Sequence, residues 1–313
     1  MLTLTATNLR RTFQDNVAVK DVSLELREGE SVGLVGPNGA GKSTTIAMLS
    51  TLLKPTAGDV TLNGDSVIAR PDPLRKILGV VPQEIALYPE LTAEENLGFF
   101  GALYGLKGQE LRQAVDQALE LVELSDRRKE SIKKYSGGMK RRINIAAALL
   151  HGPRIVIMDE PTVGVDPQSR NHILESVRTL NREHGLTVLY TSHYMEEVEQ
   201  LCDRIYIMAH GEIIAEGTKD AIKDRLSTET TIVLRVDGNA EQLATALQAV
   251  DSVQSVTTDR DGALKIIADS DNRLLASVMR EAEAAGAQVT GLNLERPSLE
   301  DVFLHLTGRT LRD

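Results

Sequence analysis

A nine-residue glycine-rich segment is the strongest chemical signal in the sequence, and it lies between an apolar strand pattern at 31–35 and a helical pattern at 44–53. Its members are Gly36, Pro37, Asn38, Gly39, Ala40, Gly41, Lys42, Ser43 and Thr44. Glycines let the backbone turn tightly and aim N–H groups at phosphate oxygens, and the following helix directs its positive end at the same anion. Lys42 adds a full charge for the β and γ phosphates, and the Ser43 hydroxyl can ligate Mg²⁺. In this strand-to-helix context the segment predicts a nucleotide phosphate site rather than an ordinary glycine-rich turn.

Two adjacent carboxylates, Asp159 and Glu160, come directly after a second apolar strand pattern at 155–158. Ligands of open α/β sheets bind outside the carboxyl ends of the strands. We therefore expect Asp159 to hold Mg²⁺ through its water shell and Glu160 to polarise an attacking water as general base. The alternative is that the two acids only cap the next turn, and the phosphate-binding segment in the same chain disfavours it.

The elements that must position these groups alternate between strands and helices. Short apolar segments rich in β-branched residues lie at 31–35, 78–81, 155–158 and 186–191, with longer helical patterns between them. This alternation predicts an α/β unit whose main sheet is parallel and buried on both faces. Between residues 92 and 150 the strand signals disappear, and Thr92 with Glu95 forms a capping-box pattern ahead of helical periodicity at 110–124. We expect an all-helical insertion there.

The pattern of strands and helices restarts after residue 226. Strands are predicted at 231–236, 253–257, 264–268 and 289–294, and helices at 241–250 and 273–285. This β-α-β-β-α-β order is the ferredoxin-like α+β arrangement, and a short last helix is predicted at 299–306. We therefore expect two domains, a nucleotide-binding domain at 1–226 and an accessory domain at 227–313.

Composition limits the classes of protein that fit the chain. Among 313 residues, 45 acidic side chains outnumber 35 basic ones, and the net charge of −10 weighs against a nucleic-acid partner. A basic run at 126–142 favours either phosphate or anionic lipid contact, or simply forms a solvated helix face. A single cysteine, Cys202, fits a reducing compartment. The sequence has no apolar run of about eighteen residues and no signal-peptide pattern at its start, so we expect a cytosolic chain that a partner holds at a membrane.

The segment at 134–142 reads KYSGGMKRR and stands shortly before the acidic strand. It resembles the signature motif of ABC ATPases, which are P-loop NTPases with a helical subdomain, and the resemblance extends over residues 2 to 220. It implies that Ser136, Gly137 and Gly138 contact an ATP held by the opposite subunit. Helix N-termini of this kind favour phosphate. The resemblance therefore implies a homodimer with two shared ATP sites.

Four further motifs of this family occur in the expected order. Phe13 resembles the aromatic residue that stacks on adenine, Gln83 the Q-loop glutamine, Asp166 the D-loop aspartate and His193 the switch histidine. Taken singly, Phe13, Gln83 and His193 are each better explained as an ordinary aromatic, turn or strand-end residue, but the joint order and spacing of the motifs favour the family. The chain departs from the commonest signature motif at Tyr135, where leucine is usual, and at Met139, where glutamine is usual. Phe13 stands where tyrosine is more frequent, and this change keeps the stacking surface and removes only a hydroxyl.

The resemblance implies a mechanism for hydrolysis of MgATP. Lys42, Ser43, Gln83 and Asp159 would hold the phosphates and Mg²⁺, and Ser136 with Gly138 of the other subunit would complete the site. Glu160 would orient water for in-line attack on the γ-phosphate while His193 stabilises the developing charge. Asp166 would link the two sites across the dimer.

Three sequence motifs resemble those of ATPase subunits of ABC-2-type exporters, such as the daunorubicin and linearmycin resistance exporters. They are the segment at 135–142, the segment Gly164–Pro167 and the ending PSLEDVFLHLTGR. In these systems a separate integral membrane permease moves drugs, antibiotics or lipid-like molecules outward, and the ATPase lies at the cytoplasmic face of the membrane. The segment Ile85–Leu91, with Leu87 and Tyr88, resembles the surface that receives the permease. The alternative is that these two side chains pack under their own loop.

Other functions remain as alternatives. ATPases of methionine importers also carry a ferredoxin-like tail, so an importer subunit is one alternative. A soluble ribosome-acting ABC protein normally joins two ATPase units, and a chromosome-maintenance ATPase needs a long coiled coil, neither of which occurs here. A non-hydrolysing binding module is disfavoured because Glu160 and His193 are both present. No residue identifies the transported compound.

Overall fold

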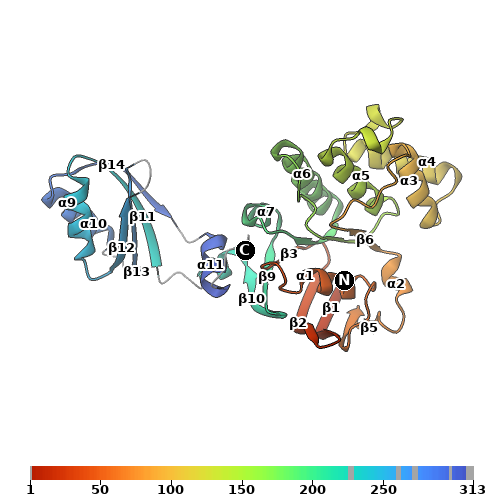
Figure 1. Cartoon of the computed structure of the whole chain (residues 1–313), viewed down its shortest axis with the longest axis horizontal. Coiled ribbons are helices and arrows are strands. Elements are labelled where there is room, and N and C mark those ends of the chain that lie inside the picture. Colours follow the sequence, from red (N-terminus) through yellow and green to blue (C-terminus); the bar gives the residue numbers. More distant parts are fainter. Residues whose placement is uncertain (1, 225–228, 259–261, 270–273, 296–297, 308–313) are drawn as a thin grey trace. The chain divides into compact units, whose positions relative to one another are not determined.

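The computed structural model describes residues 2–224, 229–258, 262–269, 274–295 and 298–307. The described residues form two compact units, one that ends at Thr218 and one that begins at Lys219 (Figure 1). The domain boundary predicted at residues 226 and 227 lies outside the described residues. No helix in the described ranges has both the length and the apolar character needed to cross a membrane.

A ten-stranded sheet is the framework of the first unit, with strand order β5-β4-β1-β2-β10-β9-β3-β8-β7-β6. Its strands are β1 (Thr3–Phe13), β2 (Asn16–Arg27), β3 (Ser31–Val35), β4 (Ala57–Leu62), β5 (Asp65–Ser66), β6 (Leu78–Val81), β7 (Ile155–Met158), β8 (Thr187–Thr191), β9 (Arg204–Ala209) and β10 (Glu212–Thr218). Strands β9, β3, β8, β7 and β6 run parallel to one another, and β3, β7 and β8 are completely buried. The predicted parallel sheet with two covered faces is therefore confirmed.

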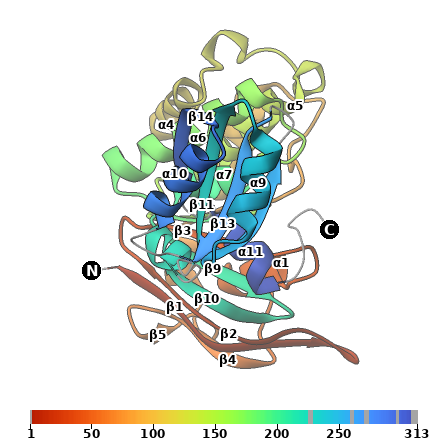
Figure 2. The same cartoon turned by 90° about the vertical axis from the view of Figure 1, so that its left-hand side faces the viewer.

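An antiparallel part of the same sheet was not predicted. Strands β1, β2, β4 and β5 pair antiparallel with one another, and Figure 2 shows them as a curled layer at the base of the unit. In β1 and β2 many buried residues alternate with exposed ones, as expected for strands with one face on the core. The glycine-rich segment connects β3 to α1 (Lys42–Leu49). Outside the helical insertion, the first unit also contains the helices α2 (Asp72–Arg75), α6 (Pro167–His184) and α7 (Met195–Leu201).

The all-helical insertion is confirmed and has a core of its own. It consists of α3 (Ala93–Leu103), α4 (Gly108–Leu121) and α5 (Gly137–Leu149), with two short 3₁₀ turns, η1 (Ser125–Arg127) and η2 (Ile132–Lys134). The predicted capping box is present, because Glu95 N–H donates to Thr92 Oγ1 (3.2 Å) and Thr92 N–H donates to Glu95 Oε2 (2.8 Å). Helix α4 ends earlier than predicted because Glu123 takes a left-handed backbone conformation (φ 53°).

The second unit has the predicted β-α-β-β-α-β order. Its elements are α8 (Lys219–Lys223), β11 (Glu229–Asp237), α9 (Ala240–Gln248), β12 (Val253–Thr258), β13 (Leu264–Asp269), α10 (Leu274–Ala284), β14 (Gln288–Glu295) and α11 (Leu299–Thr307). The sheet is antiparallel with order β12-β13-β11-β14. The inward side chains of β11 and β13 pack with α9 and α10, which gives a ferredoxin-like α+β core.

Candidate nucleotide-binding site

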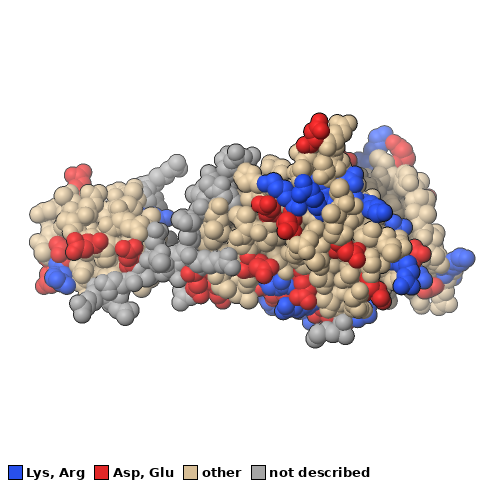
Figure 3. Space-filling model, turned by 90° about the horizontal axis from the view of Figure 1, so that it is seen from below, with Lys and Arg blue, Asp and Glu red and all other residues tan. Residues whose placement is uncertain are grey.

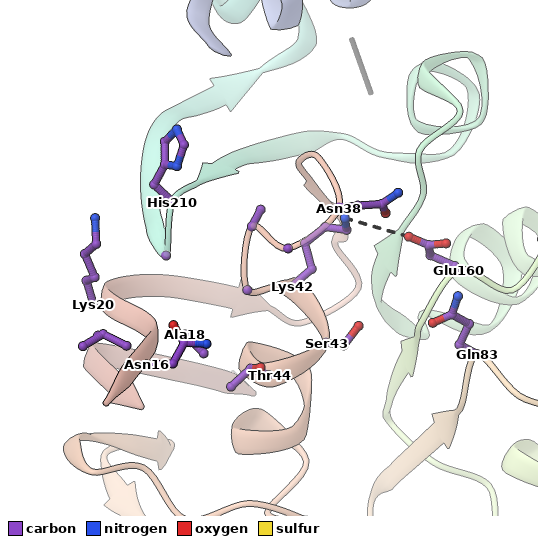
Figure 4. Close-up of a pocket in the computed structure, with 15 residues that line it drawn as sticks. Asn16, Ala18, Lys20, Asn38, Lys42, Ser43, Thr44, Gln83, Glu160 and His210 are labelled. Atoms are coloured by element: carbon purple, nitrogen blue, oxygen red, sulfur yellow. Dashed lines mark ion pairs between the residues drawn. The ribbon is translucent and has the colours of Figure 1, made fainter. Parts of the chain in front are cut away.

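A hollow of about 530 Å³ lies in front of the glycine-rich segment, at the carboxyl ends of β3 and β7, and Figure 4 shows the side chains around it. It is lined by Asn16, Val17, Ala18, Lys20, Asn38, Gly39, Ala40, Gly41, Lys42, Ser43, Thr44, Gln83, Glu160, His210 and Gly211. Its position agrees with the rule for ligands of open α/β sheets, and its size is that of a small-molecule site. The structure therefore brings residues 38–44 of the predicted loop, Gln83 and Glu160 to one cavity. The predicted site residues Gly36, Pro37, Asp159 and His193 do not line it.

The glycines of the loop are required by close backbone approach. Gly41 has φ 105°, and a Cβ there would lie 2.7 Å from both the Ala18 carbonyl oxygen and Met208 Cε. A Cβ on Gly36 would lie only 2.2 Å from the Met208 carbonyl oxygen. Because no other residue fits these positions, the loop can turn tightly from β3 into α1 and present the N-terminus of α1 to the hollow.

Lys42 is buried at the start of α1, where its ammonium group is held by backbone oxygens. Its Nζ donates to the carbonyls of Gly36 (2.7 Å) and Pro37 (3.2 Å) and lies 3.9 Å from Glu160 Oε1. Burial lowers the pKa of Lys42 from its ordinary value, and the nearby Glu160 and Asp159 carboxylates oppose that shift. The result is a buried positive charge at the floor of the hollow, which suits a phosphate group.

The two acids after β7 are fixed by a neighbouring strand. The backbone N–H of Glu160 donates to Thr191 Oγ1 (2.8 Å), and that hydroxyl donates to Asp159 Oδ1 (2.8 Å). Glu160 has a left-handed backbone (φ 45°), which is uncommon for a residue with a Cβ and is associated with functional sites. Its Oε2 lies 3.2 Å from His193 Nδ1, so the carboxylate stands between Lys42 and His193.

Gln83 reaches the hollow from the loop that joins β6 to the helical insertion. Arg141 of α5 holds this loop, because its guanidinium donates to the carbonyls of Pro82 (2.8 Å) and Gln83 (2.6 Å). Asn144 of the same helix accepts from the Ala86 N–H (3.2 Å). A movement of Gln83 would therefore be transmitted directly to α5.

The remaining residues implied by the family resemblance gather at a different place in the chain. Ser136 Oγ caps α5 by accepting from Met139 N–H (3.2 Å), and Asp166 Oδ1 caps α6 by accepting from Ser169 N–H (2.9 Å). The hydrogen bonds from Ser169 hold the pKa of Asp166 below its ordinary value. A Cβ on Gly138 would lie 2.3 Å from Ser169 Oγ, so the two helix starts are in close contact. Ser136, Gly137, Gly138 and Asp166 do not line the hollow.

Phe13 stands at the end of β1 with 42% of its surface exposed, and it is not among the residues that line the hollow. The Arg11 guanidinium lies 4.6 Å from its ring centroid. Asn16, Lys20 and His210 line the hollow and were missed by sequence reasoning. The sequence signal nearest to them is the His-Gly pair between two strand patterns, and this turn meets strand β2, because Lys20 N–H donates to the Gly211 carbonyl (2.9 Å).

Within the described part of the chain, three of the eight basic side chains in the run at 126–142 form ion pairs with acids. Arg128 contacts Glu94 (3.0 Å) and Asp116 (2.7 Å), and Lys133 contacts Glu90 (3.4 Å). Arg127 also pairs with Glu130, while Arg141 is buried against backbone carbonyls. The face drawn in Figure 3 likewise shows acidic side chains interspersed with basic ones. The ion pairs favour the alternative of a solvated helix face for these three side chains.

The donor set of the hollow fits a nucleotide with Mg²⁺. A buried ammonium, the N–H groups of a helix N-terminus and the Ser43 hydroxyl match phosphate oxygens. The amide oxygen of Gln83 in the hollow, together with the carboxylate of Asp159 directly before Glu160, matches a cation that binds one or two protein ligands together with phosphates. Nearby, Glu160 can accept a proton and His193 can donate a hydrogen bond. The arrangement can therefore support hydrolytic phosphoryl transfer.

Comparisons with known proteins agree with this geometry. A family model described as ABC transporter matches residues 19–163, and one described as the C-terminal domain of DrrA1-3-like ATP-binding proteins matches residues 217–307. The linearmycin resistance ATP-binding protein LnrL of Bacillus subtilis (strain 168) is 49% identical over 99% of this chain and 100% of its own length. The daunorubicin resistance ATP-binding protein DrrA3 of Streptomyces coeruleorubidus is 38% identical over 97% of this chain and 96% of its own. A solved dimeric ATP-binding cassette in a post-hydrolysis state with ADP and Pi gives a TM-score of 0.63 at 29% identity, over 69% of this chain and 98% of that one.

Proposed function

The chain belongs to the ATP-binding subunits of ABC transporters and hydrolyses ATP with Mg²⁺, and we propose that it drives export of a drug, antibiotic or lipid-like compound through a separate membrane permease. The observation that carries the export proposal is similarity to resistance ATP-binding proteins across both units, including a DrrA-type second unit. The proposal places the chain at the cytoplasmic face of the membrane, where a permease would hold it.

The hollow supports a division of roles among its residues. The loop N–H groups and Lys42 bind the β and γ phosphates of ATP, at the N-terminus of α1. Ser43, Gln83 and Asp159 would hold Mg²⁺, which when bound supplies charge stabilisation at the β and γ oxygens. Asn16, Lys20 and His210 are left for the base and ribose end of the same nucleotide. Phe13, which does not line the hollow, is assigned to the base by the family resemblance alone.

Glu160 acts as general base in this proposal. Its backbone is held by Thr191, and its carboxylate lies between Lys42 and His193, so its position is set before water arrives. It accepts a proton from the water that attacks the γ-phosphate, and the bond to the β-γ bridging oxygen breaks as ADP leaves. His193, hydrogen-bonded to Glu160 Oε2, stabilises charge that develops on the γ-phosphate.

The second group of residues supports a homodimer. Ser136, Gly137 and Gly138 begin α5, and Asp166 begins α6, at a corner that does not line the chain's own hollow. Two copies related by a twofold axis would each offer this corner to the other copy's ATP, with Asp166 between the two sites. The ATP then joins the subunits, and hydrolysis loosens them.

The loop between β6 and α3 supports contact with the permease. Tyr88 is 48% exposed and packs edge-on against Phe99 of α3, with ring centroids 5.0 Å apart. Leu87 instead packs against the core of the helical insertion. The alternative to a docking role, in which the side chain packs under its own loop, therefore holds for Leu87 but not for the exposed Tyr88. Because Gln83 and Tyr88 lie in this same loop, which Arg141 ties to α5, nucleotide-dependent movement could pass from the hollow to Tyr88.

Copurification from native membranes tests the export proposal. The bound proteins would be identified by mass spectrometry for the wild type and for Glu160→Gln held in ATP. Recovery of a polytopic membrane protein is expected, and the direction of ATP-dependent movement in membrane vesicles then separates export from import. Recovery of ribosomal or chromosomal proteins without a membrane protein would overturn the transport proposal and leave the ATPase chemistry intact.

A further inference from the structure

A buried carboxylate outside the hollow has no role in the mechanism above. Glu197 lies on α7 with only 2% of its surface exposed, whereas its neighbour Glu196 is exposed. Burying a carboxylate is costly unless hydrogen bonds or a counter-charge compensate for lost water. The groups that contact the Glu197 carboxylate therefore show how the cost of its burial is offset.

Three hydroxyl groups and one guanidinium group surround the Glu197 carboxylate. Thr162 Oγ1 donates to both carboxylate oxygens (2.8 and 2.9 Å), and the hydroxyls of Tyr190 (2.8 Å) and Ser192 (2.7 Å) donate to Oε2. Arg170 Nε lies 3.4 Å from Oε1. Burial, and then the charge of Glu197, keep the pKa of Tyr190 well above its ordinary value, so its hydroxyl stays protonated and can donate.

Each of these partners belongs to a segment that carries a residue of the ATPase site. Thr162 stands two residues after Glu160 and four before Asp166. Ser192 directly precedes His193, and Tyr190 directly precedes Thr191, the residue that fixes Glu160. One carboxylate thus binds both the segment that follows the general base and the segment that carries the histidine.

Arg170 extends this network to the other side of His193. Its guanidinium lies 4.1 Å from the ring centroid of Tyr194, the residue after the histidine, and Arg170 belongs to α6, which Asp166 caps. Ser192 Oγ also accepts from the Tyr194 N–H (2.9 Å). The residues on both sides of His193 are therefore held by Glu197 or by its partners.

We propose that Glu197 is a positioning residue that sets the distance between His193 and Glu160 by fastening their two segments to one buried carboxylate. The proposal rests on the roles assigned to His193 and Glu160 above. Glu197 touches neither of them, and it acts through Thr162, Tyr190, Ser192 and Arg170.

Only an acceptor with negative charge satisfies this set of partners. In Glu197→Gln, an amide nitrogen at the Oε2 position would face the hydroxyl donors of Tyr190 and Ser192. At the Oε1 position it would face the guanidinium of Arg170. Either orientation disturbs the contacts next to His193, while the glycine-rich loop and Lys42, which bind the phosphates, are left unchanged.

The first test compares Glu197→Gln with the matched control Glu196→Gln, an exposed acid on the same helix. For Glu197→Gln we expect kcat to fall by about 10- to 100-fold while the Kd for MgATP stays within about twofold of wild type, because misplacement affects chemistry more than binding. The control should match wild type in both. A kcat within about twofold of wild type, or a loss shared by the control, would overturn the proposal.

The second test asks whether Glu197 acts through His193. Single-turnover rates would be measured for Glu197→Gln, His193→Ala and the double variant, well below their thermal midpoints. If Glu197 positions His193, its loss has much less effect once His193 is absent. An equal further fold-loss in the double variant would show a merely structural role.

Two further variants keep the proposal open to refutation. If Glu197→Gln does not fold, Thr162→Val removes one donor while keeping the side-chain shape, and a smaller kcat loss at unchanged MgATP affinity is expected. An unaltered kcat in Thr162→Val would then count against the network. Glu160→Gln serves as the reference, since full turnover in that variant would refute the general-base assignment whatever Glu197 does.

Discussion

The two units of the chain differ in what they bury. Among the described residues, the buried polar and charged side chains all lie in the first unit, and they include Lys42, Asp159, Glu160 and Glu197. The second unit has an apolar core built from residues such as Leu234. Because a buried polar group costs free energy unless it is paired, a fold keeps such groups where their geometry is needed. The first unit is therefore organised for chemistry, and the second for packing.

The largest expected effect is in the first unit. Glu160→Gln keeps the side-chain shape but removes the proton acceptor, so kcat should fall by about 10³-fold while ATP binding persists. Phosphate release and equilibrium nucleotide binding measure the two quantities. Turnover at the wild-type rate would mean that another group accepts the proton.

The matching change in the second unit should affect stability alone. Leu234→Ala removes a fully buried side chain of β11 and should lower the free energy of unfolding of that unit by about 2–5 kcal/mol. Calorimetry measures this loss, and ATP turnover at low temperature should be unchanged. Leu292→Ala is the control, because Leu292 is its partner on β14 but is 37% exposed, so it should cost less. A parallel loss of turnover in Leu234→Ala would show that the division between the units is wrong.

Close packing between α5 and α6 gives a third, intermediate effect. Gly138→Ala places a methyl group where Ser169 Oγ would be 2.3 Å away, so the two helix starts must separate, at a cost of about 1–3 kcal/mol. We expect about a tenfold loss of turnover, measured as phosphate release. Adding Ser169→Gly should restore part of it, whereas no recovery would place the defect elsewhere.

The smallest effect on the isolated chain is expected at Tyr88. Tyr88→Arg changes an exposed aromatic residue, so solution ATPase activity should stay within about twofold of wild type. Transport in membranes should be lost if this surface binds the permease. Ile214→Arg, another exposed apolar position, on β10, provides the control. Normal transport in Tyr88→Arg would exclude the docking surface.

The parts of the fold that could be predicted carry local signals. Completely buried strands such as β3 and β7 appear in the sequence as short apolar runs. The helices and strands of the second unit were predictable from the periodicity of their apolar residues. Strands β1 and β2 were missed because their sequences mix apolar residues with charged ones, and β1 also pairs with the distant strand β4, with Leu4 opposite Leu62. Such long-range pairing leaves little trace in a short window of sequence.

The site shows the same limit. The loop residues, Gln83 and Glu160 were predicted to form one site because their motifs and strand ends identify them. Residues 38–44 of the loop line one hollow with Gln83 and Glu160. Lys20 and His210 were missed because strand β2 and the turn between β9 and β10 meet only in the folded chain. Glu197 was missed for another reason, since a glutamate in the helical run MEEVEQL reads as a surface residue. Its burial follows from three hydroxyl donors on other segments.

The separation of the Ser136 corner from the Lys42 hollow has a genetic consequence. In the proposed dimer each ATP site takes Lys42 from one copy and Ser136 from the other. A cell that expresses one allele defective at Lys42 and a second allele defective at Ser136 would form mixed dimers in which both lesions fall in the same site. The other site would then be entirely wild type, so two inactive alleles should complement each other in part.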